Sequence, residues 1–591
     1  MMALHLLDME RDDILKSGNA CDHKSIEYDN TEDADDVGGT DNAGDYELEA
    51  DSSDDCDDCL LDSRIRAKHG EHVIDFQKAH RALVKLICSS EVLPEHVEHG
   101  PYRDLMDMIC PNFKIDLKLV KSDCLKLYME EKARVKLIMG NMEGQISLSV
   151  DVLKYRVMCL KGHFVDDHWN LRKWVLNFRL IRQCESLADA ILMCLKDLDI
   201  EGKISTLTLV TDDGEEDEIV EKVKKKVQEK KSFQLNGQLF RVNCCAAMFN
   251  LMVKDAFEEI STITHKLYEL SWSKSMFPLW YITTSKLKNA LQLESMGEFS
   301  SQTVRDNYDV PSRDEWKKVE GVCRLVDSTY KIAKVLFETK YPTANIYLYN
   351  LQELLTVLTQ ESVGSCSFTS EVAKKMLARL DTYCKEAFMV LAVASVMDPR
   401  LKMQYIEYLC SKCEGGDDGA RTVLVLDAIH KLYDVYLKQD LEREDSITDS
   451  NSDDSEEEFP RGLEQGLCDP LWLPEYKQFI QINGQSPKSD LDWYLEEPVV
   501  PWSQDFNALK WWRAESPKYP VLSKMARVFL AIPLSVATSY EAYYTEQRPA
   551  DREVVSCGMD LMNALMCTRS WLKKPGGKEA AGKEAAREFL G

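Results

Sequence analysis

The spacing of apolar residues changes along the chain, and each change predicts an element of secondary structure. Residues 146–152 alternate apolar and polar side chains, as a half-buried strand does. Apolar residues at three- and four-residue steps predict one helix over 187–198 and another over 219–227. Three further strands are predicted, over residues 155–165, 174–181 and 205–211. The order along the chain is therefore three strands, a helix, a strand and a helix.

This order is that of a ribonuclease-H-like core, and helical patterns fill the rest of the sequence. The predicted fold class is α/β plus all-α, with the core interrupted by a large helical insertion. The expected segments, in chain order, are an acidic disordered segment (1–72), a small helical domain (73–140), the first part of the core (141–260), the insertion (261–488) with an acidic loop (439–459), a C-terminal region with the last core helix (489–575) and a flexible tail (576–591).

The net charge of the protein limits the kinds of partner that it is expected to bind. The formal net charge of -28 argues against a protein that coats nucleic acid indiscriminately, because phosphate binding needs clustered Lys and Arg. Residues 25–63 contain no Lys or Arg but many Asp and Glu. Such a segment repels itself and buries little apolar surface, which predicts disorder. A run of lysines is open to three interpretations, namely a nuclear-import signal, a phosphate contact or the solvated face of a helix, and we favour the last: Lys222, Lys224, Lys225, Lys226, Lys230 and Lys231.

The 19 cysteines are scattered, and together with an acidic start they indicate reduced intracellular thiols. No apolar run approaches the roughly 18 residues of a membrane span, so no membrane partner is expected. Cys56 and Cys59, followed by His69 and His72, have a zinc-like order. The segment between them is short and aspartates flank the thiols, so we expect an acidic linker rather than a zinc site.

Two adjoining stretches near the C-terminus carry a family resemblance. Residues 516–531 contain Ser-Pro-Lys-Tyr-Pro-Val-Leu-Ser-Lys-Met, and residues 532–548 contain Ile-Pro-Leu-Ser-Val-Ala-Thr-Ser-Tyr-Glu-Ala-Tyr-Tyr. Together they resemble the C-terminal signature of hAT-superfamily transposases, in particular the plant rice-sleeper-like group. Further segments in matching order extend the resemblance over residues 75–572. Proteins of this group often carry an N-terminal BED-type zinc finger, of which we recognise no good copy here.

The resemblance implies a site of three carboxylates that hold two magnesium ions for phosphodiester cleavage. Asp151 matches the first family aspartate and Asp212 the second, with Asp213 as an alternative register. The third family position, a glutamate, is occupied by Tyr540. Glu541 is adjacent, but neighbouring residues of a helix point about 100° apart. A phenol is neutral near pH 7 and a poor magnesium ligand.

Three further departures accompany the missing glutamate. Ala247 stands where the family has a histidine, Leu279 where it has an arginine before Trp280, and Leu153 where it has a tryptophan. We therefore expect no catalysis and no cofactor, although the ancestral site would have used Mg²⁺. An active magnesium-dependent transposase is the alternative.

The resemblance also implies self-association through the C-terminal region. Large apolar side chains at helical spacing are the candidates for dimerisation, or else they form the core of one chain: Trp511, Trp512, Val521, Leu522, Met525, Phe529 and Trp571. We expect a homodimer or higher homo-oligomer in the nucleus that associates with DNA or chromatin, for instance in transcriptional control. A dimeric scaffold without DNA binding is the remaining alternative.

Overall fold

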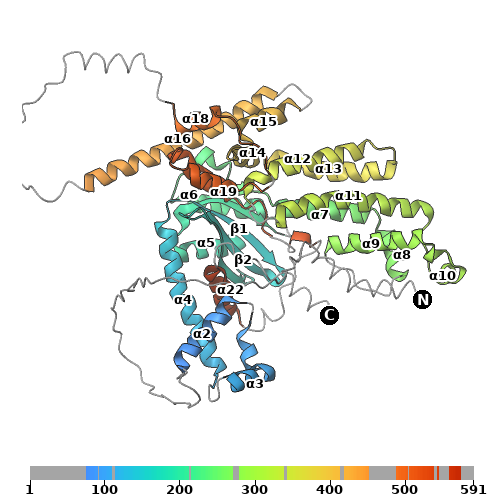
Figure 1. The fold of residues 1–591 in the computed structure, drawn as a ribbon, viewed down its shortest axis with the longest axis horizontal. Helices are drawn as coiled ribbons and strands as arrows, with labels where there is room; N and C mark the ends of the chain where they lie inside the picture. The colour runs from blue at the N-terminus through green and yellow to red at the C-terminus, as the bar shows by residue number, and fades with distance from the viewer. Residues whose placement is uncertain are drawn as a thin grey trace, which may run out of the picture.

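The computed structural model describes eleven stretches of the chain (Figure 1), namely residues 75–90, 92–109, 114–211, 214–270, 279–338, 343–412, 418–450, 488–503, 505–537, 542–544 and 558–573. The predicted acidic segment with its four zinc candidates (Cys56, Cys59, His69 and His72) and the predicted tail lie outside these residues.

A mixed β-sheet forms the centre of the fold. Within the described residues it has five strands in the order β3-β2-β1-β4-β5. The strands β1, β2 and β3 are antiparallel neighbours, whereas β4 runs parallel to β1 and β5 parallel to β4. Their bounds are Ile146–Leu153 (β1), Val157–Val165 (β2), Leu171–Leu180 (β3), Ile204–Val210 (β4) and Arg241–Val242 (β5). The predicted ribonuclease-H-like fold class is confirmed, and β5 is the strand that the sequence pattern did not predict.

The apolar side of the sheet is covered by helices. Alternation on β1 places Leu148 and Val150 on this side, where they join a core with α5 (Leu187–Leu198) and α6 (Glu216–Gln228). Ser186 caps the start of α5, and Asp199 ends it in the left-handed conformation. The 25-residue helix α4 (Leu117–Asn141) contributes Val135 and Met139 to the same core.

A second small core joins the two ends of the described chain. It unites α2 (Phe76–Ser89), η1 (Pro94–Glu98) and α4 with the last helix, α22 (Met559–Leu572), while α3 (Gly100–Ile109) lies at its margin. The predicted helical domain therefore shares its interior with a helix more than 400 residues later in the chain. The domain limits themselves stay predictions.

The helix α22 also covers the edge strand β3. The backbone N–H of Val175 donates to Ser570 Oγ at 2.9 Å, and that of Phe178 donates to Asn563 Oδ1 at 2.9 Å. These bonds satisfy N–H groups that an open edge would offer to other strands. Asn563 also donates from its Nδ2 to the Tyr128 hydroxyl of α4 at 3.2 Å, which links the edge to the helical module.

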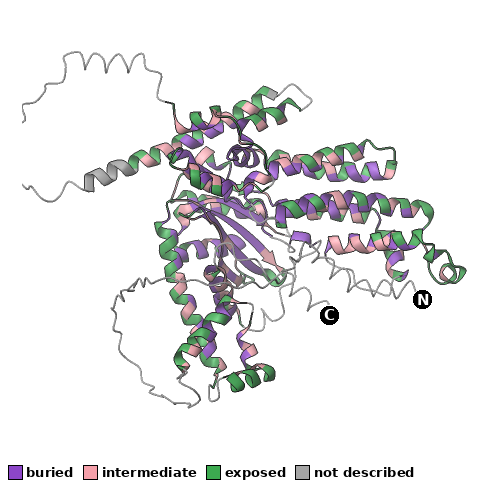
Figure 2. Cartoon of the chain, viewed as in Figure 1, coloured by how far each residue is buried: buried purple, intermediate pink, exposed green. Residues whose placement is uncertain are grey.

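The insertion after β5 is helical and extends away from the sheet (Figures 1 and 2), with buried side chains along the inner sides of its helix pairs. Its helices are α7 (Cys245–Glu258), α8 (Ser261–Leu270), α9 (Trp280–Ser295), α10 (Gln302–Asn307), α11 (Arg313–Glu338), α12 (Tyr347–Ser362), α13 (Ser367–Glu386), α14 (Phe388–Val396), α15 (Lys402–Ser411) and α16 (Asp418–Ser450).

The predicted acidic loop at 439–459 is wrong in its first part, because α16 continues to Ser450. The helix buries Ile429, Leu432 and Tyr436, and Asp440 forms an ion pair with Lys524 of α20. Packing on its neighbours thus extends the helix into the acidic run, and the rest of that run lies outside the described residues.

The C-terminal region returns to the insertion and the sheet. The helices α18 (Asp490–Glu496), α19 (Ala508–Glu515) and α20 (Pro520–Leu530) pack beside α14 and α16 (Figure 1). Among the described residues, no helix has both the length and the apolar character needed to cross a bilayer.

We predict that Asn563→Ala lowers the free energy of unfolding by about 1–3 kcal/mol, because the Phe178 N–H loses its acceptor in a half-buried place. Chemical denaturation of the purified chain measures this. Asp560→Ala, on the exposed side of the same helix, is the matched control. Equal losses for the two variants would contradict the edge-capping role of Asn563.

Candidate functional site

The second side of the sheet is polar and buried. Ser147, Ser149 and Asp151 alternate on β1 with the apolar residues of the core, and each is at most 6% exposed. His163 on β2 faces the same side, where its Nε2 and the Ser149 Oγ are 2.8 Å apart. Thr208 on β4 completes this side and is fully buried. We call these five residues the polar sheet face.

The chain segment 531–537, which we call the covering segment, lies over the polar sheet face. The Thr208 hydroxyl donates to the Pro533 carbonyl oxygen at 2.6 Å. The Cys245 N–H, at the start of α7, donates to the Leu534 carbonyl oxygen at 2.7 Å. His163, Lys173 and residues of the segment line a small cavity at this junction. Buried polar groups need such partners, so the segment contributes to stability as well as to the form of the site.

His163 is held neutral at this junction. Burial lowers the pKa of His163 well below its usual value of 6.5, and the positive charges of Lys173 and Lys161 lower it further. The neutral ring shares a hydrogen bond with Ser149. His163 and the neighbouring β2 residue Cys159 are both buried in the fold.

Asp151 is the one predicted acid that falls on described residues. It is 6% exposed and pairs across the sheet with Cys159 on β2 and with Val210, the last residue of β4. Asp212 follows Val210 by two positions, but it lies outside the described residues, as do Asp213, Tyr540 and Glu541. The assignment of the second and third positions therefore stays a prediction.

Two of the three other expected departures from the family pattern, Ala247 and Leu279, lie within or next to helices of the insertion. Ala247 is half-buried in the first turn of α7, two residues after the Cys245 amide that binds the covering segment. Leu279 forms an antiparallel bridge with Tyr544, and Trp280 is fully buried with its Nε1 donating to Asn250 Oδ1 at 3.0 Å. Leu279 and Trp280 are therefore both part of the buried interior of the protein.

The candidates for dimerisation lie within the interior of the single chain. Trp512, Leu522 and Met525 are fully buried, and only Trp511 among the seven is half-buried. Trp571 packs against Tyr128 of α4, with ring centroids 5.6 Å apart. These side chains stabilise the protomer, so their part in a dimer stays a prediction.

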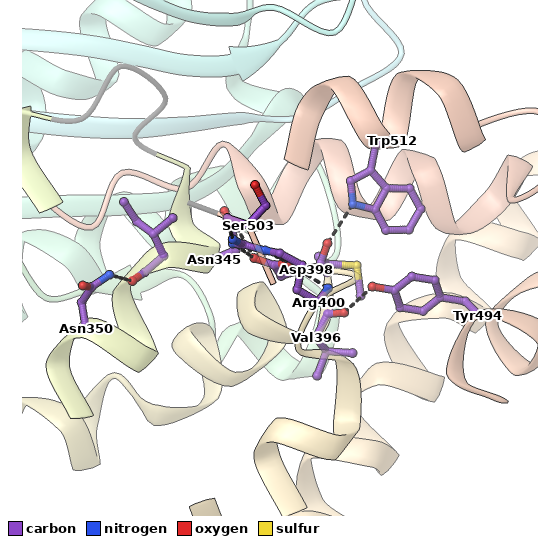
Figure 3. A network of polar contacts seen from close by, with 10 residues as sticks. Asn345, Asn350, Val396, Asp398, Arg400, Tyr494, Ser503 and Trp512 are labelled. Atoms are coloured by element: carbon purple, nitrogen blue, oxygen red, sulfur yellow. Dashed lines mark hydrogen bonds and ion pairs between the residues drawn. The ribbon is translucent and has the colours of Figure 1, made fainter. Parts of the chain in front are cut away.

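A buried ion pair anchors this C-terminal region to the insertion (Figure 3). Arg400 Nη2 donates to Asp398 Oδ2 at 2.7 Å, and both side chains are almost fully buried. Arg400 also donates from Nη1 to the Ser503 carbonyl oxygen at 2.9 Å. Breaking such a pair from one side leaves a buried charge, which costs about 3–5 kcal/mol.

Two aromatic side chains bind the same end of α14 (Figure 3). Trp512 Nε1 donates to the Met397 carbonyl oxygen at 2.8 Å, and the Tyr494 hydroxyl donates to the Val396 carbonyl oxygen at 2.8 Å. They satisfy carbonyl groups that the helix end leaves unpaired. Polar tips on large apolar rings thus explain why aromatic residues occupy these positions.

The lysine run fits the solvated face of a helix. Lys222 pairs with Asp189 at 2.8 Å, and Lys226 pairs with Glu229 at 2.9 Å. Val223 and Val227, on the opposite side of α6, are fully buried. Pairing with acids on the protein leaves these lysines less available for phosphate.

Three family models match separate parts of the chain. The ZBED1 RNase-like domain matches residues 149–239, which contain most of the sheet. The model described as hAT-like transposase, RNase-H fold, matches 345–436, which are helical in this structure. The hAT family C-terminal dimerisation region matches 490–572.

Similar proteins that match most of the chain come from plants. The zinc finger BED domain-containing protein RICESLEEPER 1 of Oryza sativa is 28% identical, over 91% of this chain and 79% of the relative. RICESLEEPER 2 of the same species is 29% identical, over 83% of this chain and 74% of the relative. The Arabidopsis thaliana protein DAYSLEEPER, also named for a BED zinc finger, is 27% identical, over 86% of this chain and 75% of the relative.

We predict that the protein loses stability as the pH falls below about 6.5, and that His163→Gln removes part of this loss. The unfolded histidine takes up a proton near its ordinary pKa, whereas the buried ring does not. The slope for one proton is about 1.4 kcal/mol per pH unit. Urea denaturation between pH 5 and 7.5 measures it.

The exposed His265 supplies the control, because His265→Gln replaces a histidine whose side chain is 75% exposed. A His163→Gln variant with the slope of the unaltered protein would show that other groups cause the acid sensitivity.

Proposed function

We propose that this chain, which is similar to hAT transposase-like proteins over most of its length, is a nuclear protein of that kind that forms homodimers and binds DNA or chromatin without cleaving it. Its role on DNA is then to occupy or to bridge sites, as in transcriptional control.

The proposal that the chain does not cleave DNA rests on the side chains around Asp151, which would have to supply metal ligands. Its described neighbours on the polar sheet face, Ser149, His163 and Thr208, are neutral and already hydrogen-bonded. A pair of magnesium ions needs several carboxylate oxygens. The sequence supplies a tyrosine, Tyr540, at the third acidic position of the family. The residues therefore do not fit the ancestral metal pair, and we derive no cleavage step through it.

Ala247, beside the covering segment, supports the same conclusion. Residues 531–537 bind Thr208 and Cys245 directly and lie over the polar sheet face. Ala247, beside this contact, offers a methyl group where the family histidine would offer an imidazole for proton transfer.

Self-association is supported by the family model that matches residues 490–572. Since the core tryptophans are buried, we infer that the contact uses the apolar side chains which this region exposes. Trp493 is 53% exposed, Val499 41% and Trp502 57%. Exposed tryptophans are typical anchors of protein interfaces.

DNA association is supported by the family and by relatives named for BED zinc fingers. The rival without DNA affinity, a dimeric scaffold, predicts no binding to duplex DNA at any salt concentration. Measuring duplex binding at several salt concentrations separates the two. When a protein contacts phosphates, the logarithm of its binding constant falls linearly with the logarithm of the salt concentration. The rival with activity is a magnesium-dependent transposase.

We predict that the purified chain does not nick or join supercoiled plasmid DNA in Mg²⁺ or Mn²⁺. Gel electrophoresis of the plasmid measures this. Cutting by the unaltered chain that disappears in Asp151→Ala would establish the active transposase and refute the proposal. Cutting that persists in Asp151→Ala would point to a contaminating nuclease, so this variant is the internal control.

We predict that Trp493→Ser weakens the homodimer by on the order of tenfold or more, as truncation of an interface anchor does. Sedimentation velocity over a range of concentrations measures the dissociation constant. Val363→Ser, at an 80% exposed position of the insertion, should leave it unchanged. A monomer at all concentrations in the unaltered chain, or equal behaviour of both variants, would contradict the proposed contact.

A further inference from the structure

The turn between β1 and β2 has an unusual backbone. It consists of η2 (Lys154–Arg156), in which Tyr155 has φ 67° and ψ 24°, and Arg156 has φ 59°. Two successive left-handed residues make the tight hairpin turn that normally takes Asn or Gly. Side chains with a Cβ are strained in this conformation. A tyrosine and an arginine therefore occupy positions where a smaller residue would be more stable.

The strained side chains are exposed rather than packed. Tyr155 is 62% exposed, and Lys154 Nζ lies 5.7 Å from the centroid of its ring. Lys154 and Arg156 are exposed on either side of it. Strain that no packing requires is a reason to look for a binding role.

More positive charge lies beside the turn. The Ile181 N–H donates to the Arg156 carbonyl oxygen at 2.9 Å, which brings the end of β3 against the turn and places the exposed Arg182 next to it. Arg182 also lines a cavity of about 270 Å³ with Arg179, Cys184, Glu185 and Met193.

Arg179 and Arg182 differ in whether an acidic side chain neutralises their charge. Arg179 is paired with Glu185 at 2.7 Å. Lys154, Arg156 and Arg182 form no ion pair within the described part of the chain. The turn therefore offers three cations and one exposed ring, in a chain whose formal net charge is -28.

We propose that this turn binds an unpaired stretch of DNA, with one base stacked on Tyr155 and the adjoining phosphates bound by Lys154, Arg156 and Arg182. Stacking on an exposed ring flanked by cations is how proteins bind single strands of any sequence. The same strand, β1, carries Asp151, so the bound DNA lies at the end of the sheet where the family would perform its chemistry. The inference deepens the proposed function and rests on its DNA-binding part.

Fluorescence anisotropy of the full chain with a labelled oligothymidine of about 20 nucleotides, and with a duplex of the same length, tests the proposal. Tyr155→Ala should weaken binding to the single strand by on the order of tenfold, whereas Tyr155→Phe should keep the affinity. The double variant K154Q/R156Q should weaken it and lower the slope against log salt by about 0.7 for each phosphate that the protein no longer neutralises.

The chain contains a matched control. Tyr408 on α15 is 55% exposed and also has a lysine near its ring, with Lys412 Nζ 5.6 Å from the centroid. Tyr408→Ala should leave the affinity for the oligonucleotide unchanged. Tyr155→Gly gives an opposite pair of effects, because it relieves the left-handed strain and removes the ring, so the Tm should rise while the affinity falls.

The possible outcomes distinguish failure of this inference from failure of the proposed function. Unaltered affinity in Tyr155→Ala, or equal losses in Tyr155→Ala and Tyr408→Ala, would overturn this inference and leave DNA binding elsewhere on the chain intact. A loss seen with the duplex alone would overturn the stacking of an unpaired base. Absence of any binding by the unaltered chain, to the oligonucleotide and to the duplex, would overturn both this inference and the DNA-binding part of the proposed function.

Discussion

A buried polar surface on the central sheet is the constraint on which the rest of this structure depends. One side of β1 presents Leu148 and Val150 to an apolar core, whereas the other presents Ser147, Ser149 and Asp151. Polar groups removed from water cost free energy unless they find partners. Here the partners come from His163 and from the chain segment 531–537, which binds Thr208 from more than 300 residues away.

Segments that are distant in the sequence supply these hydrogen-bond partners. After β5 the chain forms the helical insertion, and it then returns to the polar sheet face as the covering segment. The Asp398–Arg400 ion pair, with Trp512 and Tyr494 on the end of α14, holds the C-terminal region against the insertion (Figure 3). Beyond the covering segment, α22 closes the sheet edge and the N-terminal helical module. These contacts maintain the ribonuclease-H-like core together with the insertion that interrupts it.

Sequence periodicity predicted the elements that carry a regular pattern over several residues. The strand β1 and the helix α5 were found this way because each buries one side against a single core. The two-residue strand β5 has no such pattern, and where α16 enters the acidic run, Asp440 pairs with Lys524, which is distant in sequence. Local signals contain neither piece of information.

The candidate site was predictable to a smaller extent. Asp151 was found by its place in a family motif, and alternation predicted that it lies on the polar side of β1, but not that this side is buried. The hydrogen bonds of Thr208 and Cys245 to the covering segment depend on tertiary structure alone. The seven apolar candidates for dimerisation matched core and interface equally well, since both need large apolar side chains at helical spacing, and burial distinguishes them only once the fold is known.

We propose that the acids of this chain cannot hold the two magnesium ions that hAT transposases use. Calorimetric titration of Mn²⁺ into the unaltered chain, and into Tyr540→Glu, tests it most directly. We predict no saturable binding by the unaltered chain. Binding of two ions by the unaltered chain, abolished by Asp151→Asn, would contradict it.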